Sequence, residues 1–288
     1  MNISQPAMSK RLRALEAVAG VSLFERTSRG VTLTHAGAQL YGAARRLLHS
    51  ADGVQALIQN QLPTAPVRIA SSPSIAEHRL PKVLAELAGI QAGLSLEMVI
   101  ANSLTVRELV RTGRSDLGVA AHDPYDPPND DLAERVVWRD EIVIAVPAGH
   151  PWEELEEIPV KEFAGTAMIE REAASNASRL IVTALGEIGL QRVPPVAALG
   201  TTPTMVTVAI TSNTPVQLSL LTAMEYANLG LVIRRVAGMR FEREFSLVWV
   251  GGLMDLTDNV EAVARYIIDQ PFARSRRASR EFLDAGQP

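Results

Sequence analysis

Hydroxyl and amide side chains gather at three predicted helix starts, and these residues are well placed to bind a small molecule. They are Ser71, Ser72 and Ser74, then Asn102 and Ser103, and finally Thr201 and Thr202. A helix N-terminus exposes unpaired backbone N–H groups and a partial positive charge, and therefore favours a carboxylate, sulfate or phosphate. Plain capping of the helix explains each residue equally well when it is taken alone. Both interpretations stay open at this point.

A second set of polar side chains lines one face of a helix predicted between residues 4 and 18. The polar face consists of Ser4, Gln5, Pro6, Ser9, Lys10 and Arg13. The other face consists of Met8, Leu12 and Leu15, which recur at helical spacing as a stripe expected to be buried. The residue types of the polar face can contact base edges and phosphates in the major groove of double-stranded DNA. A solvated helix surface is the alternative interpretation.

Two basic residues follow on a predicted hairpin. Residues 23–34 form two short strands around the turn Ser28-Arg29-Gly30, which places Arg26 and Arg29 on the hairpin. Such a basic wing can contact DNA phosphates, whereas exposed hairpin charges are the plainer alternative.

A long helix is predicted from its N-cap Thr34 to about residue 62. Its apolar residues alternate steps of four and three along Leu40, Ala44, Leu47, Ala51, Val54 and Ile58. This period of about 3.5 residues is typical of a coiled-coil seam. Three glycines, Gly37, Gly42 and Gly53, each weaken the helix by about 1 kcal/mol relative to alanine. We therefore expect the chain to form a dimer through this linker helix.

Apolar runs alternate with helices from residue 67 onward, as in parallel α/β units. The expected strands are 67–70, 96–101, 117–121, 142–146, 167–169, 195–199, 231–236 and 245–250, and the expected helices are 105–112, 179–188, 204–210 and one that begins near residue 75. Two such sets predict an α/β body of two small lobes.

The charge of the chain is divided unevenly. Residues 1–62 hold seven Lys or Arg and three Asp or Glu, a net charge of +4, whereas the remainder holds 21 and 29, a net charge of −8. A basic front on an acidic body predicts a nucleic-acid-binding module joined to a domain that does not touch nucleic acid.

Signals for catalysis, metal binding and membranes are missing from the sequence. It has no cysteine, its five histidines are scattered, and no nucleophile elbow, P-loop or dinucleotide-binding motif is found. We therefore expect no enzyme activity, no metal and no cofactor. No signal peptide and no apolar stretch of about 20 residues is present, so we expect a cytoplasmic protein with no membrane partner.

Several sequence blocks closely resemble the winged helix-turn-helix of LysR-type transcriptional regulators. These blocks are Ser4-Gln5-Pro6-Ala7-Met8-Ser9-Lys10, Arg13-Ala14-Leu15-Glu16, 23–27 and 33–37. The resemblance continues through 67–77, 80–81, 116–119 and 146–151, and reaches about residue 270. It implies a sequence-specific DNA-binding regulator with a linker helix and a two-lobed effector domain like periplasmic binding proteins, controlled by a small polar or anionic effector and assembled as a tetramer.

The resemblance also implies how the chain is organised. The expected parts are a partial winged helix-turn-helix (1–34), the linker helix (35–65), lobe I (66–145 and 248–288) and lobe II (146–247). Arg171, Ser175 and Asn176 correspond to a further wall of the cleft between the lobes, where Arg171 could neutralise an anion. Family members normally carry roughly 25 to 30 residues ahead of the recognition helix, which support it. The alternative function is therefore a small-molecule-binding protein that has lost DNA binding through N-terminal truncation.

Overall fold

The computed structural model describes residues 5–27, 30–58, 66–91, 93–122 and 131–270 of the 288-residue chain. Its N-terminal part contains α1 (Gln5–Ala19), β1 (Phe24–Thr27), β2 (Gly30–Leu33) and α2 (His35–Ile58). The two strands pair antiparallel, with Phe24 opposite Leu33. These elements confirm the helix, hairpin and linker helix predicted from the sequence.

Side-chain hydrogen bonds tie the hairpin to both helices. Glu16 Oε1 in α1 accepts from the backbone N–H of Leu23 at 2.8 Å and of Phe24 at 3.1 Å. Thr34 caps α2 as predicted, because its Oγ1 accepts from the N–H of Gly37 at 3.0 Å. The same hydroxyl donates to the carbonyl of Ser22 at 2.7 Å. The entry to α2 is therefore fixed by local bonds.

The apolar stripe of α1 is not buried as the sequence predicted. Met8 is 44% exposed and Leu15 is 45% exposed. Spacing alone fixes which residues share a helix face, but burial needs a second element against that face. In the described part of the chain, α1 is bonded to the start of the hairpin through Glu16 alone.

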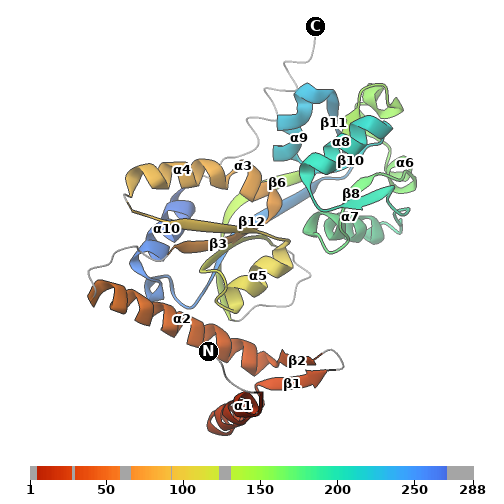
Figure 1. The fold of residues 1–288 in the computed structure, drawn as a ribbon. Helices are drawn as coiled ribbons and strands as arrows, with labels where there is room; N and C mark the ends of the chain where they lie inside the picture. The colour runs from red at the N-terminus through yellow and green to blue at the C-terminus, as the bar shows by residue number, and fades with distance from the viewer. Residues whose placement is uncertain (1–4, 28–29, 59–65, 92, 123–130, 271–288) are drawn as a thin grey trace.

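The body consists of strands and helices in two lobes (Figure 1). The strands are β3 (Val67–Ser71), β4 (Leu96–Ile100), β5 (Leu117–Ala121), β6 (Leu132–Pro147), β7 (Glu157–Ile158), β8 (Ile169–Arg171), β9 (Ala197–Leu199), β10 (Val216–Ser219), β11 (Leu231–Val236) and β12 (Phe241–Val250). The helices are α3 (Pro73–His78), α4 (Leu80–Ile90), α5 (Ser103–Arg111), α6 (Val160–Gly165), α7 (Asn176–Glu187), α8 (Thr202–Ser212), α9 (Leu220–Tyr226) and α10 (Asp258–Asp269). Short 3-10 turns are η1 (Pro151–Glu154), η2 (Ala227–Leu229) and η3 (Leu253–Asp255).

Two long antiparallel strands join the lobes. Parallel pairing, as the sequence indicated, is present within each lobe: β3 pairs with β4 and β5, and β8 pairs with β9 and with β10, a strand that the sequence did not predict. β12 pairs antiparallel with both β5 and β6, and β6 continues into the second lobe, where it pairs antiparallel with β10 and β11. The strand predicted at 142–146 is thus the second part of the longer strand β6, and its pairing is antiparallel rather than parallel as the sequence indicated. The first half of β6 contains several charged residues, and its longest apolar run has only three residues, so it was not recognised as a strand.

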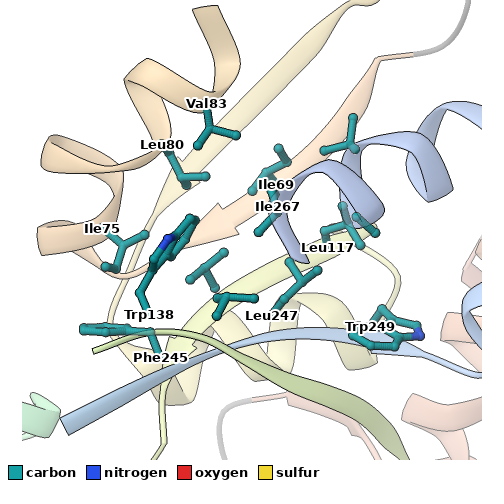
Figure 2. Packing of buried hydrophobic residues seen from close by; sticks show 14 of the residues in the cluster. Ile69, Ile75, Leu80, Val83, Leu117, Trp138, Phe245, Leu247, Trp249 and Ile267 are labelled. Carbon is teal, nitrogen blue, oxygen red and sulfur yellow. The ribbon is translucent and has the colours of Figure 1, made fainter. Parts of the chain in front are cut away.

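Each lobe has its own hydrophobic core. In the first lobe, side chains from β3, β5, β12 and α10 meet those of α3 and α4, as Figure 2 shows for Ile69, Leu80, Leu117, Phe245 and Ile267. The second lobe buries two clusters, one against α6 and α7 and one against α8 and α9. Two separately packed lobes leave a boundary at which polar groups can meet.

Candidate functional site

A cavity of about 60 Å³ lies between the lobes. Its walls come from the starts of α3, α5, α7 and α8 and from the strands β6, β10 and β12. These helices follow strands of the sheet, so their N-termini converge at the edge where open α/β sheets bind ligands. A cavity of this volume has room for roughly four to six water molecules, and hence for a molecule of similar size.

Most of the predicted ligand-binding residues line this cavity. They are Ser72, Ser74, Asn102, Ser103, Arg171, Ser175, Asn176 and Thr202. Ser71 and Thr201 lie outside its wall. Ser71 is fully buried and its hydroxyl donates to the carbonyl of Ser72, while Thr201 is exposed and donates to Thr204 Oγ1 at 2.7 Å.

Three hydroxyl groups of the cavity wall, those of Ser72, Ser103 and Thr202, use their hydrogens within the protein. Ser72 Oγ donates to the Val119 carbonyl at 3.2 Å and lies 3.2 Å from Ser103 Oγ. Ser103 Oγ accepts from the N–H of Ala121 at 3.0 Å. Because the one hydrogen of Ser72 Oγ goes to Val119, the Ser103 hydroxyl is the donor to Ser72. Thr202 Oγ1 donates to Glu77 Oε2 at 3.0 Å. These oxygens therefore present lone pairs to the cavity.

The start of α7 is organised by a cap. Ser175 Oγ accepts from the N–H of Ser178 at 3.2 Å and donates to Ser178 Oγ at 3.1 Å. Arg171 Nε and Nη2 lie 3.1 and 3.3 Å from the carboxylate of Glu172. The charge of Arg171 is therefore paired with Glu172 in this structure, and its neutralisation of an anionic ligand stays a prediction.

Sequence reasoning missed a buried ionic group at the lobe junction. Arg243 Nη2 donates to Asp140 Oδ2 at 2.8 Å and to Ser74 Oγ at 2.9 Å, and Ser219 Oγ donates to the same carboxylate oxygen at 2.7 Å. The side chains of Arg243 and Asp140 are 9% and 1% exposed. Gln217, also missed, lines the cavity from β10. The alternation of Val216-Gln217-Leu218-Ser219 was the available signal, but four residues are too short a run to single out.

The predicted DNA-facing residues lie on α1 and the hairpin, clear of both lobes at one end of α2 (Figure 1). Lys10 and Arg13 are exposed and Ser9 is half-buried, with Arg13 Nε 3.4 Å from the carbonyl of Ser9. Ser4 and Arg29 lie outside the described residues, as do the side chains of Gln5, Pro6 and Arg26. Lys10 and Arg13 are therefore open to solvent, and their contact with DNA stays a prediction.

The seam of the linker helix is open to solvent in the single chain. Leu40 is 37% exposed and Leu47 is 72% exposed, and Ala44 and Ala51 are exposed as well. The side chains of Val54 and Ile58 lie outside the described residues.

Neither a metal-binding group nor a membrane-spanning helix is found among the residues that the structure describes. Across those residues no group of three or more His, Asp or Glu side chains could hold a metal ion. No helix described there combines the length and apolar character that a membrane span needs.

Comparison with known protein families decides the identity. The model of the LysR substrate binding domain matches residues 60–269. The chain belongs to the LysR family. The model of the bacterial regulatory helix-turn-helix protein of the lysR family matches residues 1–38, which favours a DNA-binding regulator over a protein that binds small molecules alone. This LysR-type protein is thus a transcription regulator with a helix-turn-helix region and an effector-binding domain.

Relatives and solved structures agree with the LysR assignment. A protein of Mycobacterium bovis, named as an uncharacterized HTH-type transcriptional regulator, is 31% identical over 264 residues, which cover 88% of this chain and 84% of that protein. The regulatory domain of CcmR from Synechocystis PCC6803 in complex with 2-PG has a TM-score of 0.63 at 17% identity, over 72% of this chain and 99% of that one. Full-length CbnR complexed with its target DNA has a TM-score of 0.55 at 15% identity, over 92% and 89%. Both structures share the fold.

Proposed function

We propose that this LysR-type regulator changes how it sits on DNA when a small polar or anionic effector binds in the interlobe cavity. The main observation in support of this effector site is that polar residues from four separate helix starts meet in one cavity between two separately packed lobes. An effector can shift the balance between lobe arrangements only by its different affinity for each. The complex of the similar CcmR domain with 2-PG supports a small-molecule ligand in this fold.

The DNA contacts proposed here come from the polar face of α1 and from the hairpin. The residues that would lie against the major groove are Ser4, Gln5, Pro6, Ser9, Lys10 and Arg13. The residues that would contact phosphates are Arg26 and Arg29. The exposure of Lys10 and Arg13 and the complex of the similar CbnR with DNA support this arrangement.

The proposed assembly is a dimer through the seam of α2, with dimers pairing into a tetramer. The exposed leucines of α2 support the first step, because an isolated helix with such a seam is stabilised by a partner helix. We further propose that the parts of the chain are those expected from the sequence, with lobe I formed by 66–145 and 248–288 and lobe II by 146–247. The packing of α10 in the first core supports the return of the chain to lobe I. The protein would act in the cytoplasm and catalyse no reaction.

Substitution of Asn102 tests the proposed cavity. Its Oδ1 caps α5 by accepting from the N–H of Thr105 at 3.0 Å, and an aspartate keeps this cap. Asn102→Asp adds a negative charge to the wall, so an anionic effector should bind at least tenfold more weakly, equal to about 1.4 kcal/mol. The matched control is Asn213→Asp, at an exposed left-handed position at the far end of α8.

Calorimetry with 2-PG, shikimate and other small anions would measure both variants. We expect Asn213→Asp to bind the effector as the wild-type protein does. Equal affinity of Asn102→Asp and wild type for the anion that binds would contradict the cavity assignment.

A further inference from the structure

Gln217 is a deeply buried amide on the wall of the cavity. It lies in β10, is 1% exposed and pairs across the sheet with Ile144 of β6. Its neighbours Val216 and Leu218 belong to the core against α8 and α9. Because side chains alternate along a strand, Gln217 points to the other face of the sheet, the face that α7 covers.

Among the residues that the structure describes, the side-chain nitrogen of Gln217 has no hydrogen-bond partner. A buried donor without a partner is costly, so such groups need an explanation. The hydroxyl groups of Ser72 and Thr202 on the cavity wall donate their hydrogens inside the protein. The Gln217 amide is therefore a buried donor that is available to a molecule in the cavity.

The start of α7 supplies a second feature on the same wall. The helix has 12 residues, and the first N–H groups of a helix have no partner within it. Asn176 and Ala177, its first two residues, line the cavity. Asn176 Oδ1 is also buried and without a partner. This wall therefore offers donors, from Gln217 and the backbone, beside one acceptor.

We infer that Gln217 and the first turn of α7 select a small carboxylate that carries a neighbouring hydroxyl or ammonium group. The carboxylate oxygens would accept from Gln217 Nε2 and from the backbone N–H groups of α7. The hydroxyl or ammonium group would donate to Asn176 Oδ1. The size of the cavity fits such a molecule. The inference rests on the proposed effector cavity and specifies the chemical class of effector that this cavity binds.

The first arm of the test needs no ligand. If the Gln217 amide is unpaired in the free protein, Gln217→Met removes a buried donor at similar volume, and the Tm should rise by about 2 to 4 °C. The matched control is Gln91→Met, because Gln91 Nε2 donates to Asn259 Oδ1 at 2.8 Å and its loss should not raise the Tm. A Tm of Gln217→Met below that of the wild type would show that the amide has a structural partner, and would overturn the inference.

The second arm measures ligand-induced Tm shifts with two matched series: propanoate, lactate and alanine, and succinate, malate and aspartate. The substituted carboxylates should shift the wild-type Tm more than propanoate or succinate do. Gln217→Glu, which replaces the donor by a carboxylate, should lose at least tenfold in affinity, and Gln91→Glu should not. Wild-type affinity in Gln217→Glu, or no preference for the substituted acids, would overturn the inference. If no acid shifts the wild-type Tm, the proposed anionic effector fails, while the first arm still decides whether the Gln217 amide is unpaired.

Discussion

At the scale of single residues, the buried pair of Arg243 and Asp140 holds the junction between the lobes. Arg243 bonds Ser74 at the start of α3 as well as Asp140, and Ser219 of β10 bonds the same carboxylate. The group therefore joins the first lobe, both connecting strands and the second lobe.

Removal of the Arg243 charge should show how much the buried pair contributes to the stability of the fold. Arg243→Met would leave Asp140 buried without its partner, at a cost of about 3 to 5 kcal/mol in the free energy of unfolding. The matched control is Arg139→Met, because Arg139 pairs with Glu244 at an exposed position, where such pairs contribute about 0 to 1 kcal/mol. Urea denaturation measures both variants. A loss below about 1 kcal/mol in Arg243→Met would show that the junction does not depend on this pair.

Single residues also show how far the sequence predicted the site. The helix-start residues were predicted because capping types and spacing are local signals, and Ser72, Asn102 and Thr202 do line the cavity. Gln217 and Arg243 were missed because their roles depend on the pairing of distant strands. Gly37 was interpreted as a weak point of the linker helix. In the structure a Cβ at this position would overlap the backbone carbonyl of Leu23, so close packing of α2 on the hairpin requires glycine there.

At the scale of elements, the sequence predicted α1, the hairpin, α2 and most strands of the lobes. It missed β10 and the first half of β6, because neither is an apolar run of ordinary strand length. The antiparallel pairing of β6 with β12 was missed as well, since no local pattern records which distant strands become neighbours.

A substitution in the seam of α2 tests the proposed dimer interface. Leu47→Asp would place a carboxylate in the proposed dimer interface, where an unpaired charge costs several kcal/mol, and should convert the dimer to a monomer. Gln39→Asp, at an exposed position on the outer side of the same helix, should leave the mass unchanged. Light scattering measures the mass of each variant. The same mass for Leu47→Asp and wild type would place the interface elsewhere.

At the scale of the whole molecule, the protein has three parts: the helix α1 with the hairpin, the linker helix α2, and the two-lobed body. In Figure 1, α1 and the hairpin lie at one end of the long helix α2, apart from the two lobes, and the proposed effector cavity lies between those lobes. We propose that α1 and the hairpin contact DNA and that α2 pairs two chains. The sequence predicted this division from charge and periodicity together with the LysR resemblance. It did not predict how the lobes are connected, which is through the long antiparallel strands β6 and β12.

The central claim is that occupation of the interlobe cavity changes the arrangement on DNA. DNase footprinting of the full chain on its own promoter region, with and without the anion that binds by calorimetry, measures this directly. We expect the footprint of the wild-type protein to change in length or position with the ligand, because the ligand favours one lobe arrangement. The footprint of Asn102→Asp should match that of the ligand-free wild type at the same ligand concentration. A wild-type footprint that stays the same when the cavity is saturated would contradict the claim.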